Sequence, residues 1–297
     1  MGRMELRQLR AFERVVALGS FSRAAEELAL SQPGVTAQIQ GLERELGVRL
    51  LERLPRRVLL TAAGEALLPF ARIMLNLEED ARRALEELRG LQAGTLRVGA
   101  SPTVGAYLLP ALLGELKRRH PGLRTIAEIR PTQEVAAALE THALDIGLVE
   151  AAVDSASLRI EPFGTDELVL IVPSGHPWSA RGAVRPEELA GQPLIVREPG
   201  SGTRQLVEER LRALGVEVTP SLELGAIEAI KNAVAAGLGV AFISRLAVQP
   251  EQRLGILCVV SVEGLDLRRP FYRLLHRQRQ PSPAVAAFLD VLAKASG

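Results

Sequence analysis

The periodicity of the apolar residues changes at Gln92-Ala93-Gly94, and this change divides the chain into two unlike parts. Before it, apolar residues recur every three or four positions, which is typical of amphipathic helices. After it, short strand-like runs alternate with helical patterns, an order that predicts parallel strands joined by right-handed crossovers. Because 297 residues are also long for a single hydrophobic core, we expect more than one domain.

The stretch from Ser31 to Gly47 is predicted to be a short helix with a polar leading end. Ser31 is a favourable N-cap, Pro33 falls within the first turn, and Gly47 supplies a left-handed C-cap. One face of this helix is apolar and is expected to be buried; it carries Val35, Ile39, Leu42 and Leu46.

Two shorter helical patterns precede this helix. The first runs from about Glu5 to Leu18 and ends at Gly19, and Ser22 is expected to cap the second. Such a set of helices with a tight turn predicts a helix-turn-helix, in which the last helix enters the major groove with its N-terminal residues toward the bases. An ordinary three-helix bundle with a polar outer face is the alternative.

Residues 48–52 and 58–60 are short β-like runs that flank a loop rich in arginine, which predicts a wing. Guanidinium groups suit contact with phosphate or with the minor groove because they are always charged. A run of charge alone usually marks solvated surface, but its position directly after the helices favours contact with DNA. Polar side chains at the start of the preceding helix suit base edges or phosphates. The expected DNA-binding residues are Ser31, Gln32, Pro33, Thr36, Gln38, Arg53, Arg56 and Arg57.

Thr61 is expected to cap a long helix that runs to residue 92. A helix of this length, roughly 40 Å at 1.5 Å per residue, is predicted to have no neighbour in its own small domain. It should therefore pair with a second copy of the chain. Its heptad-like seam is Leu67, Ala71, Met74, Ala81, Leu85 and Leu88. A homodimer follows, with two recognition helices on the two inverted-repeat half-sites of double-stranded promoter DNA.

Residues 93–297 hold two series of strands and helices, which predict two similar α/β lobes joined by more than one crossing strand. This is the plan of periplasmic-binding-protein-like domains. We expect lobe I at about 93–165 and 267–297, and lobe II at about 166–266. The whole chain is then multidomain, with an all-α winged helix-turn-helix domain (residues 1–60), a linker and dimerisation helix (61–92) and a two-lobed α/β effector-binding domain (93–297).

Ligands of such lobes bind outside the carboxyl ends of the strands, where helix N-termini point inward. Several strand-to-helix loops here carry hydroxyl groups or glycines that let a backbone approach a ligand closely. Each of these hydroxyl residues is alternatively an ordinary helix cap, but their convergence on one cleft favours a binding site. The expected effector-binding residues are Ser101, Pro102, Thr103, Thr132, Gly200, Ser201, Gly202, Thr203, Ile227 and Glu228.

The charge of the effector is predicted from the same loops. Helix dipoles favour an anion, and Arg130, Arg197 and Arg204 could pair with a carboxylate, sulfate or phosphate. Acidic residues close by in the sequence would offset these arginines; they are Glu150, Glu198 and Glu228. We favour a small anionic metabolite.

Enzyme chemistry has little support in the sequence. The four histidines lack paired metal-ligand spacing, and Gly200-Ser201-Gly202 does not have the glycine spacing of a nucleophile elbow. No phosphate-binding loop of the GKS or GKT type is present, so we expect no catalytic residues, no metal and no cofactor. The lone Cys258 excludes a disulfide framework within one chain. No apolar run approaches the ~18 residues of a membrane span, and we expect a cytoplasmic protein.

The segment GSFSRAAEELALSQPGVTAQIQGLERELGVRLLER, followed by R-V-x-L-T-A-A-G, resembles the LysR-type transcriptional regulators over residues 4–65. The resemblance implies a DNA-binding domain here, then a dimerisation helix, then a module that binds its inducer between two lobes, in an assembly that is a dimer of dimers. Ala37 departs from a position that is basic in many members, and Leu51 replaces a common phenylalanine.

A second resemblance concerns the effector domain. PGSGTR and IEAIKNAVAAGLGVAFIS resemble the branch of that family that controls carbon fixation and sulfur or cysteine metabolism. The function expected from the sequence is therefore a homotetrameric DNA-binding regulator controlled by a small anionic metabolite. The alternatives are a cytoplasmic sensing protein without specific DNA readout and a metabolic enzyme on a two-lobed scaffold. The recognition helix with its arginine wing discriminates against the sensing protein, and the enzyme lacks candidate catalytic residues.

Overall fold

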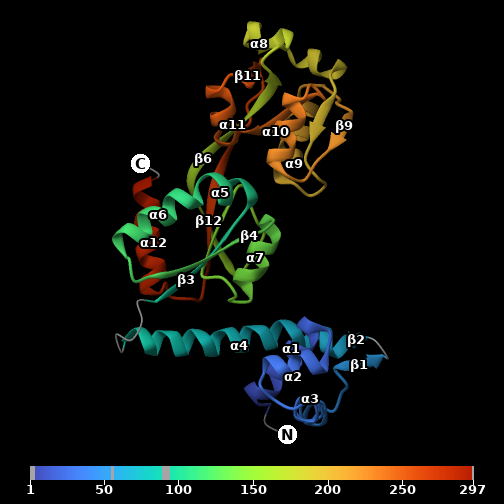
Figure 1. Cartoon of the computed structure of the whole chain (residues 1–297), viewed down its shortest axis with the longest axis vertical. Coiled ribbons are helices and arrows are strands. Elements are labelled where there is room, and N and C mark those ends of the chain that lie inside the picture. Colours follow the sequence, from blue (N-terminus) through green and yellow to red (C-terminus); the bar gives the residue numbers. More distant parts are fainter. Residues whose placement is uncertain (1–3, 55–56, 89–93, 296–297) are drawn as a thin grey trace.

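The computed structural model describes residues 4–54, 57–88 and 94–295, which form an N-terminal helical unit, a long helix and a two-lobed α/β unit (Figure 1). The first unit contains α1 (Leu6–Leu18), α2 (Phe21–Glu27), α3 (Gln32–Leu46), β1 (Leu51–Leu54) and β2 (Arg57–Leu60). Strands β1 and β2 pair antiparallel as a hairpin, which gives the expected helix-turn-helix its wing. Among the described residues, no helix is long and apolar enough to cross a membrane.

The helices of the first unit begin and end largely where the sequence predicts. Gly19 and Gly47 end α1 and α3 in the left-handed conformation, with φ of 61° and 70°. The cap of α2 differs from the prediction: Ser20, not Ser22, accepts a hydrogen bond from the backbone N–H of Arg23 at 3.3 Å. Helix α2 thus begins two residues earlier, because the chain enters it directly from the turn at Gly19.

The end of α3 and the start of the wing also differ from the prediction. Leu46 is 39% exposed, because the last turn of α3 extends beyond the core that buries the other three apolar residues of that face. The first wing strand begins at Leu51 rather than Val48. Before it, Glu43 of α3 accepts hydrogen bonds from the backbone N–H groups of Leu50 (2.8 Å) and Leu51 (3.3 Å), which fixes the wing to the recognition helix.

Helix α4 (Ala62–Leu88) is the linker helix. Thr61 caps it as expected, accepting from the N–H of Gly64 at 3.1 Å and donating to the carbonyl of Arg49 at 2.6 Å. The expectation that this helix has no neighbour in its own domain is wrong, because its first half packs on the core of the helical unit and Ala71 is fully buried there. Among the side chains of α4 that the structure describes, the large apolar ones left exposed are Phe70, Leu77 and Leu85.

Lobe I is built on three parallel strands with helices on both sides (Figure 1). Its strands are β3 (Thr95–Ala100), β4 (Arg124–Ile129) and β5 (Ile146–Val149), and its helices are α5 (Pro102–Tyr107), α6 (Leu109–Arg119), α7 (Thr132–Glu140) and the C-terminal α12 (Pro283–Ala295). Phe288 of α12 is completely buried in the lobe I core, so the end of the chain returns to this lobe.

Lobe II contains β7 (Ala183–Val184), β8 (Leu194–Val196), β9 (Pro220–Glu223), β10 (Val240–Ser244) and β11 (Leu257–Val262). Its helices are α8 (Pro177–Arg181), the 3-10 helix η1 (Pro186–Gly191), α9 (Gly202–Ala213), α10 (Ile227–Ala235) and α11 (Arg245–Arg253). Two long strands cross between the lobes: β6 (Leu158–Pro173) and β12 (Arg268–His276) pair antiparallel. The strand order β4-β3-β5-β12-β6-β10-β8-β9 shows that both lobes share one sheet.

Candidate DNA-binding surface and effector cleft

The leading end of α3 presents its polar residues to solvent. The side chain of Ser31 accepts from the backbone N–H of Gly34 at 3.1 Å, so this hydroxyl caps the helix. Gln32 and Pro33 are exposed, and Thr36 and Gln38 are half-buried. Figure 1 places α3 on the side of the helical unit that faces away from α4 and the effector domain. A major groove could therefore approach these side chains without meeting the rest of the chain.

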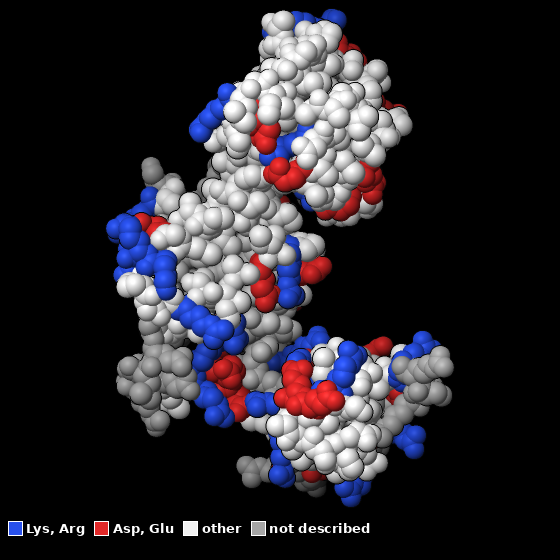
Figure 2. Space-filling view, in the orientation of Figure 1, with Lys and Arg blue, Asp and Glu red and all other residues white. Residues whose placement is uncertain are grey.

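The wing lies beside this surface. Arg57 is exposed and begins β2, and the register of the hairpin places it opposite Leu54. Arg53 lies in β1, but its side chain falls outside what the structure describes, as does all of Arg56. Figure 2 shows basic atoms at this end of the helical unit. The expected contact of the wing with phosphate stays a prediction at all three arginines.

The cleft expected between the lobes would begin at the carboxyl ends of β3 and β5, where the two lobes meet. Ser101 is completely buried; its backbone N–H donates to the carbonyl of Leu148 at 3.0 Å, and its hydroxyl makes no hydrogen bond with the described residues. Thr103 is 1% exposed and donates its hydroxyl proton to the carboxylate of Glu150 at 3.3 Å. Pro102, between them, begins α5. Ser101 caps no helix with its side chain, so the ordinary explanation for a serine here does not hold.

Glu150 follows β5 directly and is buried. Its second carboxylate oxygen has no hydrogen-bond partner among the described residues. Burial raises the pKa of Glu150 above the ordinary value of 4.5, although the nearby Arg269 works in the opposite direction. Buried polar groups usually have hydrogen-bond partners, so the free carboxyl oxygen of Glu150 and the free hydroxyl of Ser101 are suited to contact a polar ligand.

Arg269 of β12 connects the two lobes at the cleft. Its Nε and Nη2 donate to Oδ2 of Asp166 on β6 at 2.9 and 2.7 Å, and its Nη1 donates to the hydroxyl of Thr203 at the start of α9 at 3.1 Å. Ser244 donates to the other oxygen of Asp166 at 2.6 Å. All four side chains are buried, so two crossing strands and lobe II meet in one polar network.

Arg269 and Asp166 were not among the residues expected from the sequence. Arg269 begins the strand-like run RPFYRLLH, which also contains Arg273 and His276, so its charge alone does not mark it as a site residue. The arginines named from the sequence have other partners: Arg130 pairs with Glu128, Arg197 with Glu198, and Arg204 with Glu208 and Glu223. The buried guanidinium that faces Glu150 and Thr203 is therefore Arg269.

The loop before α9 lies against lobe I. A Cβ added to Gly202 would come within 3.2 Å of the Cβ of Ala151, so a glycine here allows the lobes to approach closely. Gly200 has a φ of 85°, which favours glycine, and Ser201 caps α9 without a side-chain hydrogen bond.

The other three residues expected to bind the effector, Ile227, Glu228 and Thr132, lie in different parts of the effector domain. Ile227 packs against the core of lobe II. Glu228 bridges the lobes: it accepts from the hydroxyl of Tyr107 on α5 at 2.9 Å and pairs with Lys231 at 2.8 Å. Thr132 is the first residue of α7, and Pro131, not Thr132, stands at the N-cap. Figure 2 shows acidic and basic side chains together where the two lobes meet.

Within the described ranges, no group of three or more His, Cys, Asp or Glu residues is arranged so that it could hold a metal ion. His142 and His276 lie together, with ring centroids 4.5 Å apart, at the end of lobe I opposite the cleft.

Comparison with known proteins identifies the family. Residues 6–65 match the model of the bacterial regulatory helix-turn-helix protein, lysR family, and residues 89–297 match the LysR substrate binding domain. The chain belongs to the LysR family of DNA-binding transcriptional regulators. It is 36% identical over 289 residues to a probable RuBisCO transcriptional regulator of Cyanidioschyzon merolae, covering 95% of each chain. This confirms the family expected from the sequence, and the relative's name agrees with the expected resemblance to the carbon-fixation branch.

The solved structures that resemble the chain include two complexes. Full-length CbnR complexed with its target DNA is 25% identical, with a TM-score of 0.73, over 99% of this chain and 100% of that one. The regulatory domain of Synechocystis PCC6803 CcmR in complex with 2-PG is 28% identical, with a TM-score of 0.64, over 68% of this chain and 97% of that one. The two-lobed fold and its N-terminal helix-turn-helix are thus confirmed.

Proposed function

We propose that this regulator binds promoter DNA through the leading end of α3 and the wing, and that a small anionic metabolite held between the lobes controls it. The site is made by Ser101, Thr103, Thr203 and Arg269. The observation that carries the proposal is the buried guanidinium of Arg269 between the lobes, together with the buried hydroxyl of Ser101, which has no hydrogen-bond partner in the described part of the chain. A regulator of chromosomal DNA would act in the cytoplasm.

The anionic character of the effector is supported by the state of Glu150. Because burial raises the pKa of this carboxyl above its ordinary value, it opposes a bound anion less than an exposed glutamate would, while Asp166 remains the partner of Arg269. Hydroxyl groups of Thr103 and Thr203 and a guanidinium are suitable donors for a carboxylate or phosphate. The complex of the related CcmR domain with 2-PG makes 2-PG the first compound to test.

The proposed assembly is a homodimer through α4 that associates further to a tetramer. The exposed stripe of Phe70, Leu77 and Leu85 supports the first step, because large apolar side chains on one side of a long helix suit a second copy of it. Two recognition helices would then contact the two half-sites of an inverted repeat, as the CbnR complex with its target DNA suggests for this chain.

Isothermal titration calorimetry of the full-length protein tests the effector site. We expect 2-PG or inorganic phosphate to bind, and Ser101→Ala and Thr103→Val each to weaken that binding at least about tenfold, since one buried hydrogen bond to a charged group is worth 1.5–3 kcal/mol. The matched control is Ser174→Ala, on the surface of lobe II. Unchanged affinity in both cleft variants would place the site elsewhere.

A further inference from the structure

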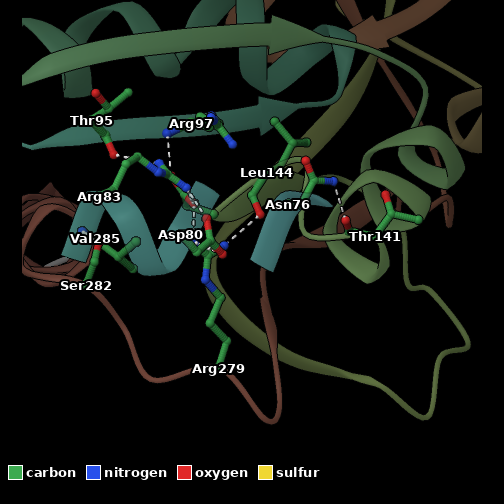
Figure 3. A network of polar contacts seen from close by, with 11 residues as sticks. Asn76, Asp80, Arg83, Thr95, Arg97, Thr141, Leu144, Arg279, Ser282 and Val285 are labelled. Carbon is green, nitrogen blue, oxygen red and sulfur yellow. Dashed lines mark hydrogen bonds and ion pairs between the residues drawn. The ribbon is translucent and has the colours of Figure 1, made fainter. Parts of the chain in front are cut away.

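The linker helix α4 has a face that neither the helical unit nor the exposed apolar stripe uses. Asn76, Asp80 and Arg83 are spaced by four and three residues, so they share this face. Figure 3 shows all three directed at lobe I. Asn76 donates its side-chain amide to the carbonyl of Thr141, at the end of α7, at 2.6 Å. The side chain of Arg83 donates to the carbonyl of Thr95, at the start of β3, at 3.5 Å.

Four charged side chains join at this contact. Asp80 pairs with Arg83 on its own helix and, at 2.8 Å, with Arg279 of lobe I. Arg279 also pairs with Asp145 at 2.8 Å, and Arg83 approaches Asp145 at 3.6 Å. Two carboxylates and two guanidiniums balance in charge. We call this cluster the linker latch: Asp80, Arg83, Asp145 and Arg279.

Each side of the linker latch is fixed to its own domain. Asp145, whose side chain is 2% exposed, accepts from the backbone N–H of Arg97 at 2.7 Å, so its position is set within lobe I. On the other side, Glu78 of α4 pairs with Arg10 of α1 at 2.6 Å, which ties the helix to the DNA-binding unit. Partly buried pairs are screened less than exposed ones, and removing one partner leaves an uncompensated charge.

The rest of the junction is loosely packed. A groove of 610 Å³ separates α1 and α4 from α7, and Arg72, Arg130 and Glu134 are among its lining residues. Figure 2 shows mixed acidic and basic side chains where the linker helix meets lobe I. The orientation of lobe I on the linker helix therefore depends strongly on the polar contacts of Figure 3.

Three neighbouring strands connect the linker latch to the effector cleft. Asp145 immediately precedes β5 and Glu150 immediately follows it, so one strand of lobe I has a latch residue at one end and a cleft residue at the other. The distance along that strand is about 17 Å at 3.3–3.4 Å per residue. Strand β3 runs parallel to it, from the carbonyl that Arg83 contacts to Ser101.

Strand β12 completes the arrangement. It runs antiparallel to β5, so its start lies at the cleft and its end at the latch. Arg269 is its second residue, and Arg279 follows its end by three residues. A shift of these strands at the cleft is thereby delivered to the latch, because hydrogen-bonded strands of one buried sheet move as a unit.

We propose that the linker latch transmits effector occupancy from the cleft to the DNA-binding unit by holding lobe I in one orientation on α4. This inference rests on the proposed function for its signal, but the latch itself is a property of the chain without effector. Coupling between two sites requires an element that has two distinct arrangements and whose equilibrium both sites bias.

The experiment uses the full-length protein with Asp80→Asn, Arg279→Gln and their combination. The matched control is Arg273→Gln, which removes an ion pair of 2.9 Å with Glu161 from the same strand β12 but lies outside the latch. Small-angle X-ray scattering without effector measures the latch. We expect both single variants to increase the radius of gyration, the double variant to add little to either, and the control to match the wild type. Unchanged scattering in both single variants overturns the latch.

A second arm measures transmission. Affinity for a DNA fragment from upstream of the protein's own gene is measured with and without saturating 2-PG or inorganic phosphate. We expect a change of at least about fivefold in the wild type and the control. In the latch variants the change is lost while the effector's own affinity, from calorimetry, stays within about twofold. A full change in both latch variants overturns the proposal. If neither compound binds the wild type, the proposed function fails, and scattering alone decides the latch.

Discussion

Arg269 donates two hydrogen bonds to a single oxygen of Asp166, at 2.9 and 2.7 Å, and so joins the two strands that cross between the lobes. The two residues are 103 positions apart in the chain. Their side chains are 6% and 0% exposed, which makes this the most deeply buried ion pair described in the effector domain. The same guanidinium donates to Thr203 at the start of α9. One side chain therefore contacts both the crossing strand β6 and a residue of the expected effector site.

Arg269→Gln should destabilise the effector domain by about 3–5 kcal/mol, because it leaves the buried carboxylate of Asp166 without its cation. Urea unfolding followed by tryptophan fluorescence of Trp178, which is buried in lobe II, measures the change. The control is the adjacent Arg268→Gln, whose side chain is 70% exposed and pairs only on the surface. A loss of less than about 1 kcal/mol for Arg269→Gln would show that the pair does not stabilise the hinge.

Gln32→Ala and Arg57→Ala should affect DNA binding in different ways. Gln32 lies at the exposed start of α3, so its loss should cost about 1–3 kcal/mol on the specific site and little on random DNA. Arg57→Ala, on the wing, should weaken binding to both the specific site and random DNA. It should also reduce the slope of log K against log salt concentration by about 1. Fluorescence anisotropy at several salt concentrations measures both effects. Equal losses on specific and random DNA for the two variants would contradict this division of roles.

Leu77→Glu should shift the protein toward monomer. Leu77 is 45% exposed on α4, and a charge there would be buried against the second copy of the helix. Sedimentation velocity over a range of concentrations measures the distribution. Leu254→Glu, at a 74% exposed leucine of lobe II, is the control and should leave it unchanged. A dimer that withstands Leu77→Glu would exclude α4 as the dimer interface.

Acidification should destabilise the folded chain through His142 and His276. Burial lowers the pKa of both rings below the ordinary value of 6.5. At His142 the charges of His276 and Arg279 add to this effect and Asp80 opposes it, and at His276 Arg279 adds to it and Glu140 opposes it. The unfolded chain therefore binds more protons near that pH, so stability is full above about pH 6.5 and falls as pH drops through the folded pKa values. Urea midpoints between about pH 8 and 5 test this. His142→Asn, which tolerates the positive φ of this residue, should flatten the fall, whereas His120→Asn should not.

Much of the DNA-binding unit could be predicted from the sequence because its signals are local. Caps such as Ser31 and Gly47 and apolar spacings act over a few residues, and the structure has them in place. The prediction that Ser22 caps α2 is wrong, because Ser20 is an equally suitable cap and the helix begins two residues earlier. The prediction that Leu46 is buried is also wrong, because the last turn of α3 extends beyond the core.

The cleft and the linker latch are less accessible to sequence reasoning. Ser101 and Thr103 could be found from strand-to-helix loops, but Arg269 has no local pattern that distinguishes it from the surface residue Arg268 beside it. The pairing of Asp80 with Arg279 likewise joins distant segments. The tertiary fold determines which charged residues pair in this way, and the periodicity of apolar residues along the sequence does not predict those pairs.

The central claim is that a small anion in the cleft changes DNA binding, and one measurement tests it most directly. Affinity for the fragment from upstream of the protein's own gene is determined with increasing 2-PG or inorganic phosphate, for the wild type and for Thr103→Val. We predict a saturable change in the wild type, and the same change at a concentration at least about tenfold higher in the variant. An identical response of the two proteins, or a DNA affinity that no concentration of either compound alters, would contradict the account.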